Sequence, residues 1–166
     1  MDDRTLILLR HSKSDWSTGA DDLRRPLARR GLRQAPQAGR WLAANVGRID
    51  LAVVSPAERT RATWELVSAE LAVAPPRRYD ERMYAASGRT LLAVVRELTD
   101  DLGTVVLVGH NPGLEDLVTT VTGRWVRLPT SAVAVLSVPG AWSSVGGSTA
   151  ELRASGRPPA PSSGTG

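Results

Sequence analysis

Three short apolar runs recur along the chain and predict strands that are buried on both faces of a sheet. They cover residues 5–9, 51–54 and 104–108. None of them alternates between apolar and polar positions, as a strand with one face in water would. Continuous apolar runs of this kind are typical of the strands of a parallel sheet that carries helices on both sides.

Apolar residues at helical spacing separate these runs and predict helices between the strands. The expected helices cover residues 32–46, 57–71, 89–98 and 114–122. Pro36 lacks a backbone N–H, so we expect the first helix to begin no more than one turn before it. Further extended segments are expected at residues 77–79, 132–138 and 150–154.

The alternation of strands and helices predicts an α/β fold, a three-layer αβα sandwich with a mostly parallel central sheet. The 166 residues suit one domain of ordinary size, which we expect to cover residues 1–156. Residues 157–166 are rich in Pro, Ser and Gly and almost free of apolar side chains. Such a segment cannot bury enough apolar surface to fold, so we expect a disordered tail.

The composition excludes several classes of site. The chain has no Cys, which excludes disulfides, zinc–thiolate sites and cysteine nucleophiles. Residues 1–4 are acidic in character and lead into a short apolar run, so no signal peptide is expected. No apolar stretch is long enough to cross a bilayer. We therefore expect a soluble, cytoplasmic protein with no membrane partner.

The charge of the chain is strongly basic, with a net charge of +4 and a pI of about 10.5. A pI this high suggests nucleic acid as a partner. The basic residues are scattered, however, and no nucleic-acid motif is present, so we expect no such partner. The densest basic cluster consists of Arg24, Arg25, Arg29, Arg30 and Arg33. Two interpretations stay open: a rim that attracts an anionic, phosphorylated substrate, and a solvated face.

The chain has only two histidines, and each directly follows a predicted strand. Arg10 and His11 follow the first strand, and His110 comes just after the third. Ser55 ends the second strand, and Arg59 lies one helical turn beyond it. Ligands of open α/β sheets bind beyond the carboxyl ends of the strands. We therefore expect these arginine and histidine side chains to meet in one pocket.

This set of side chains favours an anion over a metal ion. Without Cys, two imidazoles would need carboxylate ligands to hold a metal, and adjacent guanidinium groups would repel the cation. Guanidinium groups instead match the oxygens of a phosphoryl group. An imidazole in such a pocket can attack phosphorus as a nucleophile. We expect a phosphoryl-binding site with no metal and no cofactor.

Four stretches of the chain resemble, in order, the motifs of the histidine phosphatase superfamily, also called the phosphoglycerate mutase-like family. They are residues 8–16, the Arg25-Pro26-Leu27 segment with Gly31, residues 55–63 and residues 108–112. The resemblance implies a phosphoglycerate mutase-like fold. One position departs from the family pattern, because Ser12 follows the Arg-His pair where Gly is usual. A positive φ at this position would strain a serine.

The resemblance also implies the roles of the clustered side chains. His11 would be the nucleophile that becomes phosphorylated. Arg10 and Arg59 would bind the phosphoryl oxygens. His110 would hydrogen-bond the phosphoryl group and stabilise the transition state.

The remaining site residues are the proton donor and further substrate ligands. A carboxylic acid of the family protonates the leaving group and later activates water. Glu81 is the expected acid, with Asp80 and Asp15 as alternatives. Ser12 and Arg25 are expected to contact substrate.

The short connections between the motifs leave no room for an inserted lid and resemble the SixA-type phosphohistidine phosphatases. A Thr-Ser pair within residues 128–132 is similar to one in that branch. The implied substrate is a phosphorylated protein carrying phosphohistidine, or else a small phosphorylated metabolite. A broad small-molecule phosphomonoesterase and a non-catalytic phosphate-binding module on the same fold remain alternatives. A mutase needs a closed pocket, which the short connections disfavour.

Overall fold

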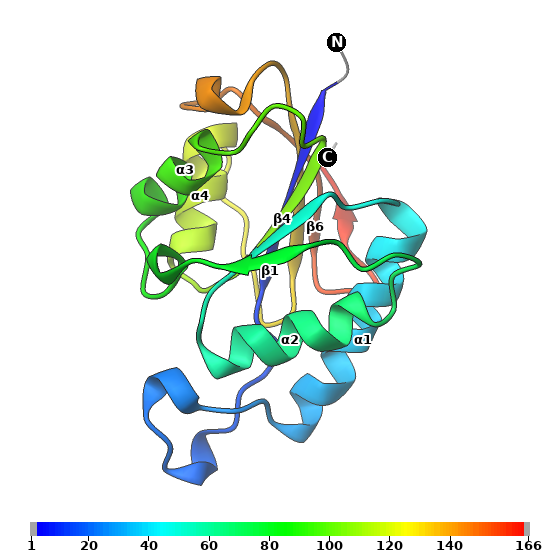
Figure 1. Ribbon diagram of the computed structural model, residues 1–166, viewed down its shortest axis with the longest axis vertical. Coiled ribbons are helices and arrows are strands. Elements are labelled where there is room, and N and C mark those ends of the chain that lie inside the picture. Colours follow the sequence, from blue (N-terminus) through cyan, green and yellow to red (C-terminus); the bar gives the residue numbers. More distant parts are fainter. Residues whose placement is uncertain (1–2, 165–166) are drawn as a thin grey trace.

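Helices cover both faces of a seven-stranded sheet in the computed structural model, which describes residues 3–164 (Figure 1). The strands are β1 (Arg4–Arg10), β2 (Leu51–Val54), β3 (Arg77–Tyr79), β4 (Thr104–Gly109), β5 (Val133–Val138), β6 (Glu151–Gly156) and β7 (Ser162–Ser163). The α-helices are α1 (Arg29–Asn45), α2 (Glu58–Ser68), α3 (Gly88–Arg96) and α4 (Gly113–Thr122). Short 3-10 helices are η1 (Trp16–Thr18), η2 (Asp22–Arg24), η3 (Glu81–Met83) and η4 (Trp142–Ser144).

The strand order of the sheet is β3-β2-β4-β1-β5-β6-β7. The strands from β3 to β1 pair in parallel, and β5, β6 and β7 add antiparallel pairs at the other side. The expected three-layer architecture is confirmed. Because β2, β4 and β1 are neighbours, their carboxyl ends lie side by side, and these are the strands that lead into the expected site.

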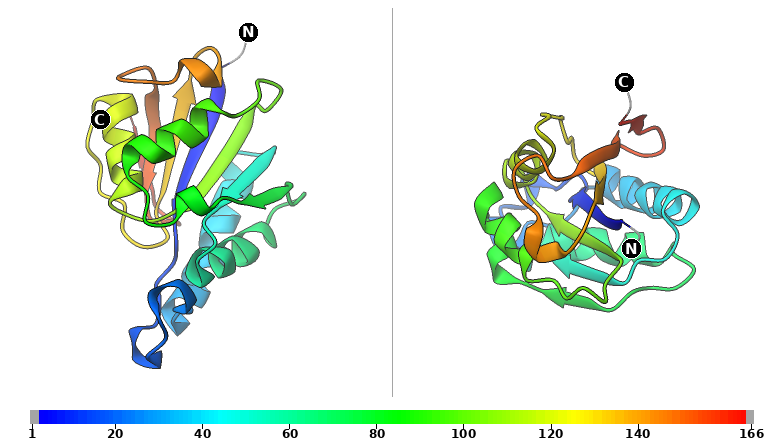
Figure 2. Two further views of the ribbon diagram at one scale, coloured as in Figure 1. Left: turned by 60° about the vertical axis from the view of Figure 1, so that its left-hand side comes forward. Right: turned by 90° about the horizontal axis from the view of Figure 1, so that it is seen from above.

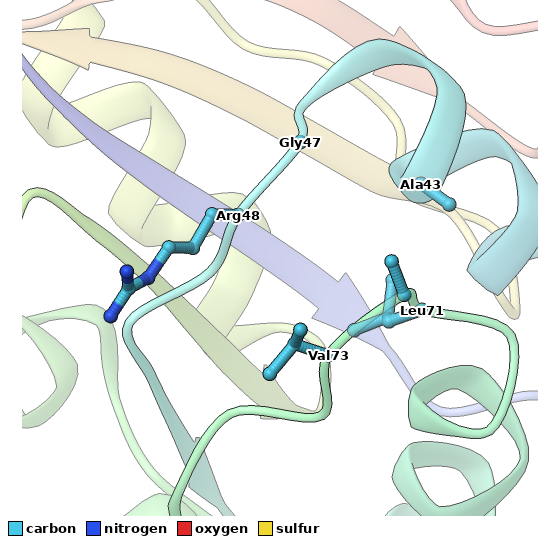
Figure 3. Close-up of a pocket in the computed structure, with 6 residues that line it drawn as sticks. Ala43, Gly47, Arg48, Leu71 and Val73 are labelled. Atoms are coloured by element: carbon cyan, nitrogen blue, oxygen red, sulfur yellow. The ribbon is translucent and has the colours of Figure 1, made fainter.

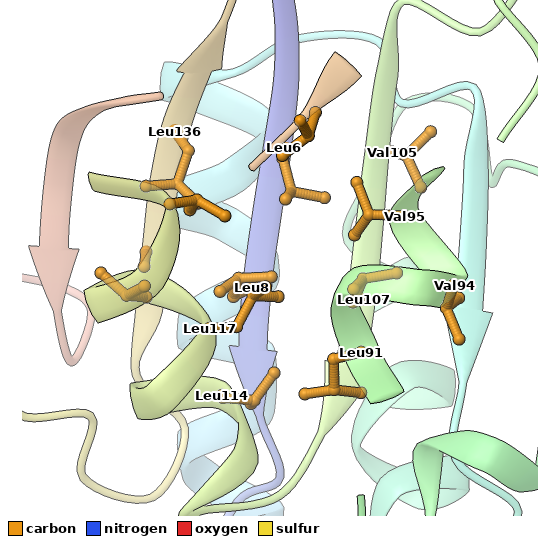
Figure 4. Packing of buried hydrophobic residues seen from close by; sticks show 14 of the residues in the cluster. Leu6, Leu8, Leu91, Val94, Val95, Val105, Leu107, Leu114, Leu117 and Leu136 are labelled. Atoms are coloured by element: carbon orange, nitrogen blue, oxygen red, sulfur yellow. The ribbon is translucent and has the colours of Figure 1, made fainter. Parts of the chain in front are cut away.

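The apolar run of β1 is continuous because both of its faces are covered. Leu6 and Leu8 point to the face under α3 and α4, where they join one apolar cluster (Figure 4). Ile7 and Leu9 point to the face under α1 and α2 and join the other cluster. All four side chains are fully buried. Successive strand residues face opposite sides, so a strand between two helix layers is apolar at every position.

The structure corrects the expected start of the first helix. α1 begins at Arg29, about two turns before Pro36, which lies in its interior. The missing N–H of Pro36 would have bonded to the carbonyl of Leu32. Leu32 is half exposed, so that carbonyl can turn towards water. An exposed face therefore tolerates a proline that a buried face would not.

The structure also orders most of the segment that we expected to be a disordered tail. Ser162 and Ser163 form β7 and pair with Ser155 and Ala154 of β6. The Nε of Arg157 donates to the carbonyl of Thr130 at 2.8 Å. These bonds use backbone groups and one long polar side chain, so they do not require the apolar content that the segment lacks. Residues 165 and 166 of the expected tail lie outside the described residues.

The segment between β1 and α1 leaves the carboxyl end of the sheet and projects beyond it (Figure 2). It carries η1 and η2, which each form a single short turn. Its two halves meet where Ser14 and Leu27 form an isolated bridge. This segment therefore stands over the same edge of the sheet as the expected site. Over residues 3–164, no helix combines the length and apolar character needed to cross a membrane.

Candidate active site

His11 and His110 lie next to each other beyond the ends of β1 and β4. The two strands pair in parallel, with Arg10 opposite Gly109. The next residue on each strand is therefore a histidine, and the two ring centroids are 5.3 Å apart with the planes tilted by 52°. The structure thus brings together the two imidazoles that the sequence placed on separate strands.

The hydrogen bond of His11 fixes which ring nitrogen is free. His11 is buried, and its Nδ1 lies 2.8 Å from the carbonyl oxygen of Ser12. A carbonyl oxygen only accepts, so Nδ1 must carry the proton. In the neutral ring the lone pair is then on Nε2, which is the form of imidazole that can attack an electrophile.

Both imidazoles are held in the neutral form by their surroundings. The pKa of His11 is lowered to about 4, chiefly by burial and also by the charges of Arg59 and Arg10, against the opposing effect of the hydrogen bond to the Ser12 carbonyl. Burial likewise lowers the pKa of His110 to about 3, with contributions from His11 and Arg59. Burial disfavours charge of either sign, but the nearby charges of Arg59 and Arg10 that add to the effect favour a negative ligand.

Ser55 holds the second imidazole. Its hydroxyl lies 2.8 Å from the Nε2 of His110, while the Nδ1 of His110 is buried without a hydrogen-bond partner among the described residues. The sequence suggested only a turn or helix-capping role for Ser55. The register of the two parallel strands pairs Val54 with Val108, so Ser55 comes opposite Gly109, the residue before His110.

Arg59 is buried at the start of α2 and is hydrogen-bonded to Asp22. Its Nη1 donates to the backbone carbonyl of Asp22 at 2.6 Å, and its Nη2 donates to the Oδ2 of the same residue at 3.2 Å. Its Nε is buried without a partner among the described residues. The guanidinium is therefore fixed on one side and keeps a free donor on the other.

The Asp22 carboxylate accepts hydrogen bonds from three side chains. Besides Arg59, it accepts hydrogen bonds from the Nη1 of Arg25 at 2.7 Å and from the hydroxyl of Tyr84. The hydrogen bond from Tyr84 is the largest cause that holds the pKa of Asp22 far below its usual range, and those from Arg25 and Arg59 add to it. Asp22 is therefore a carboxylate at neutral pH. The sequence did not single it out as a site residue.

Arg25 lies behind Asp22 rather than at the front of the pocket. It is buried, its Nε donates to the hydroxyl of Ser14 at 3.0 Å, and its guanidinium lies 3.6 Å from the centroid of the exposed Trp16 ring. The guanidinium thus stacks on an aromatic ring and donates hydrogen bonds to two different side chains, as is typical of Arg. The structure therefore places Arg25 as a support of Asp22, whereas the sequence predicted a substrate ligand.

Arg10 lies at the end of β1, half buried beside the loop that follows α4. Its Nη1 donates to the carbonyl of Leu128 at 3.1 Å, which also accepts from the side-chain amide of Asn111 at 2.8 Å. Its Nε is buried without a partner among the described residues. Burial lowers the pKa of Arg10, and Glu115 opposes this effect. Arg10 and Arg59 thus each keep a buried donor beside the imidazoles.

Ser12 is fully buried and engaged inside the protein. Its N–H donates to the hydroxyl of Thr63 at 2.9 Å, and its hydroxyl donates to that of Ser131 at 2.9 Å. The Ser12 hydroxyl, which the sequence predicts to contact substrate, is thus bonded to Ser131 in this structure. Positive φ occurs at Ser131, at 66°, and not at Ser12. The serine that replaces the usual glycine is consequently unstrained.

A cavity of about 500 Å³ opens beside Arg59 and His110, which line it. His11 and Arg10 are not among the lining residues, and the ring of His11 adjoins the cavity through the ring of His110. Residues from the projecting segment, the loop after η3 and the start of α4 line it. They are Asp22, Arg59, Tyr84, Ala85, Ala86, Ser87, His110, Asn111, Pro112 and Asp116. The ring of Tyr84 meets that of His110 edge-on, with centroids 5.7 Å apart. The cavity is large enough for the reacting end of a phosphorylated substrate.

The structure does not bring the expected acids to this cavity. Glu81 is exposed on η3 and is not among the lining residues. Asp80 accepts hydrogen bonds from Arg82, and Asp15 accepts them from Ser17. The carboxylates of the cavity wall are instead those of Asp22 and Asp116, both missed by the sequence analysis.

A second hollow lies at the other end of the sheet and has a different character. It has a volume of about 210 Å³, and five of its six lining residues are uncharged: Ala43, Gly47, Leu71, Ala72 and Val73 (Figure 3). Arg48 is the sixth. These residues precede β2 and β3, so this hollow is remote from the carboxyl ends of the strands and from the histidines. Over residues 3–164, no group of three or more His, Asp or Glu side chains is placed to hold a metal ion.

The comparisons with known proteins agree with this geometry. The model of the histidine phosphatase superfamily (branch 1) matches residues 6–87. A crystal structure from Agrobacterium tumefaciens, assigned as a phosphohistidine phosphatase SixA, is 30% identical and superposes with a TM-score of 0.75. The match covers 81% of this chain and 92% of that one. The chain belongs to the histidine phosphatase superfamily.

Further relatives indicate to which branch of the superfamily the chain belongs. A structure from Nakamurella multipartitia, also assigned as SixA, is 28% identical with a TM-score of 0.84, over 96% of this chain and 99% of that one. An uncharacterised protein of Mycobacterium tuberculosis is 36% identical over 148 residues, which cover 82% of this chain and 91% of that protein. This histidine phosphatase is therefore of the SixA type, a hydrolase of the histidine-nucleophile phosphatase class.

Proposed function

We propose that this histidine phosphatase removes the phosphoryl group from phosphohistidine in a phosphorylated protein, through a phosphorylated His11. The observation that carries the proposal is that neither Asp22 nor the expected Glu81 is placed to protonate a leaving group, which leaves Asp116 as the one remaining carboxylate among the residues that line the cavity. Asp22 is tied up as a carboxylate by Arg25, Arg59 and Tyr84, and Glu81 lies outside the cavity.

The first chemical step is attack by the Nε2 of His11 on phosphorus. A new N–P bond forms while the bond from phosphorus to the substrate nitrogen breaks, and that nitrogen keeps the electron pair. Water then attacks the phosphorylated His11, which releases inorganic phosphate and restores the free imidazole. The Ser12 carbonyl holds Nδ1–H throughout, so it keeps Nε2 directed at the phosphoryl group.

The transition state spreads negative charge over the phosphoryl oxygens. The buried Nε donors of Arg10 and Arg59 and the Nδ1 of His110 are suited to bind those oxygens, because they have no other partner among the described residues. Ser55 supports this role when it donates to the Nε2 of His110, since Nδ1 then carries the proton. Donors that are fixed before the reaction give the largest electrostatic stabilisation.

The lack of a free acid at Asp22 and at Glu81 bears on the substrate class. A phosphate ester leaves as an alkoxide, which needs a proton in the transition state and hence a general acid. A phosphorylated imidazole that is protonated on its other ring nitrogen leaves as a neutral ring and needs no further proton. The site is therefore better suited to phosphohistidine than to phosphate monoesters.

The test is a comparison of substrates with the purified protein. Release of inorganic phosphate is measured from a protein phosphorylated on histidine, from phosphoserine and phosphotyrosine peptides, and from small sugar phosphates. We expect kcat/KM for the phosphohistidine protein to exceed the others by at least about a hundredfold, the minimum that a general acid usually contributes. Equal turnover of the monoesters would make the protein a broad phosphomonoesterase. Binding of phosphate without turnover of any substrate would make it a non-catalytic module.

A further inference from the structure

A strongly basic groove, separate from both hollows described above, lies near the catalytic residues. It has a volume of about 290 Å³ and is lined by Arg30, Arg33, Gln34, Gln37 and Arg157. No carboxylate lines it, and no described ion pair within residues 3–164 involves its three arginines. The function proposed above makes no use of these side chains.

Hydrogen bonds place both walls of this groove close to His11. On one wall, the side chain of Gln34 accepts from the backbone N–H of Lys13 at 2.9 Å, two residues beyond His11. On the other wall, Arg157 donates to the carbonyl of Thr130 at 2.8 Å. The next residue, Ser131, donates its N–H to the carbonyl of His11 at 2.9 Å.

The positive charge continues from the groove to the catalytic Arg10. The charge of Arg30 contributes to the lowered pKa of Arg157, whose largest cause is burial. Arg157 in turn contributes to the lowered pKa of Arg10. Arg127 acts on both. Like charges held this close repel one another, and an anion bound among them relieves the repulsion.

The structure gives different surroundings to the arginines of the basic cluster in residues 24–33, for which the sequence allowed two interpretations. Arg24 and Arg25 are paired with Asp21 and Asp22. Arg30 and Arg33 instead join Arg157, a residue far away in the sequence, in one concave site. The convergence of distant residues on a hollow is not expected of a merely solvated helix face.

We propose that this groove binds the carboxylates of acidic residues that flank the phosphorylated residue of the protein substrate. The inference rests on the proposed function and adds its substrate class, namely a phosphoprotein with an acidic surface next to the phosphorylation site. The 500 Å³ cavity lies beside His110, and the walls of the groove are hydrogen-bonded to Lys13 and Thr130. The two sites share no lining residue, so a ligand that reaches both must be extended, as a polypeptide is and a small metabolite is not.

The test compares two phosphohistidine peptides of equal length, one with glutamates and one with glutamines on each side of the phosphorylated residue. At low salt, the wild-type protein is expected to show a kcat/KM about tenfold higher for the glutamate peptide. The R30Q/R33Q double variant is expected to bring that ratio close to one. R29Q removes a charge from the same helix outside the groove and is expected to keep the wild-type ratio. High salt is expected to abolish the preference.

A second measurement separates the groove from the chemistry. Fluorescence anisotropy follows binding of a labelled, unphosphorylated glutamate peptide to the wild-type protein and to R30Q/R33Q. Weaker binding by the double variant but not by R29Q supports the groove even if neither phosphorylated peptide is turned over, an outcome that would overturn the proposed function alone. Equal kcat/KM for both peptides in the wild type, or a preference that survives in R30Q/R33Q, overturns the groove proposal.

Discussion

Asp22 binds Arg59 twice, through its backbone carbonyl at 2.6 Å and through its carboxylate at 3.2 Å. The two residues come from different elements, η2 and α2. Arg25 and Tyr84 hold the same carboxylate from two further directions. The orientation of the Arg59 guanidinium is therefore set by a residue that lies on the projecting segment and not on the sheet.

Replacing Asp22 with Asn is expected to lower kcat/KM for the phosphohistidine substrate by roughly tenfold to a hundredfold. The amide keeps the shape of the side chain but removes the charge that anchors Arg59, and a small misplacement of a catalytic group has an effect of this size. The loss should fall mainly on kcat. Asp21→Asn is the matched control, because Asp21 is an exposed neighbour that pairs with Arg24. Equal kinetics for the two variants would remove Asp22 from the site.

The two histidines are expected to remain neutral well below neutral pH. Their pKa values are lowered to about 4 for His11 and about 3 for His110, chiefly by burial. Because the chain has no other histidine, NMR of the ring protons gives two titration curves, and His110→Asn assigns them. A midpoint near 6.5 for either ring would contradict the buried, positively charged environment.

The same shifts fix the sign of the pH dependence of stability. Between about pH 6.5 and pH 4, an unfolded histidine binds a proton while the folded one does not. The free energy of unfolding is therefore expected to fall as the pH is lowered through this window. His11→Asn removes one of the two titrating groups, so urea denaturation of this variant should show a smaller decrease. An identical decrease in the variant would mean that other groups cause it.

Glu81→Gln is expected to leave the turnover of phosphohistidine within about twofold of the wild type. Glu81 is exposed and outside the cavity, so it is not placed to donate a proton to the leaving group. Steady-state kinetics provide the measurement. Since a general acid contributes at least about a hundredfold, a decrease of that size would restore Glu81 as the acid.

Gly31→Ala is expected to destabilise the fold by about 1–3 kcal/mol, because it overpacks a tight contact. A Cβ at this position would lie 2.2 Å from the backbone carbonyl oxygen of Lys13. The backbone of Lys13 can only give way by moving the chain next to His11, so activity should fall too. Gly146→Ala is the control, because its Cβ would meet nothing within 4 Å. Urea denaturation of both variants measures the difference.

Much of the fold could be predicted because strand burial leaves a direct mark on the sequence. The runs that became β1, β2 and β4 are apolar at nearly every position, and parallel pairing then brings His11 and His110 together. The local backbone was harder to predict. The apolar pattern shows neither that α1 continues through Pro36 nor that β7 pairs with β6. The first depends on whether a backbone carbonyl without a partner can reach water, and the second on whether backbone groups can reach a neighbouring strand.

The supporting residues of the site could not be predicted for a similar reason. Asp22 and Tyr84 are far apart in sequence and meet because the projecting segment contacts the residue that follows η3. Glu81 followed from the resemblance alone, and two residues separate it from Tyr84, which does line the cavity. Ser55 was within reach, because the register of two parallel strands places it beside His110.

The central claim is that His11 itself carries the phosphoryl group during turnover. The most direct measurement mixes the protein with a radiolabelled phosphohistidine protein of different mass, quenches the reaction within milliseconds in alkaline denaturant, and separates the two by size. We predict acid-labile label on the wild-type enzyme and none on His11→Ala. Label on the His11→Ala variant, or rapid turnover by the wild type with no label at any quench time, would contradict the account.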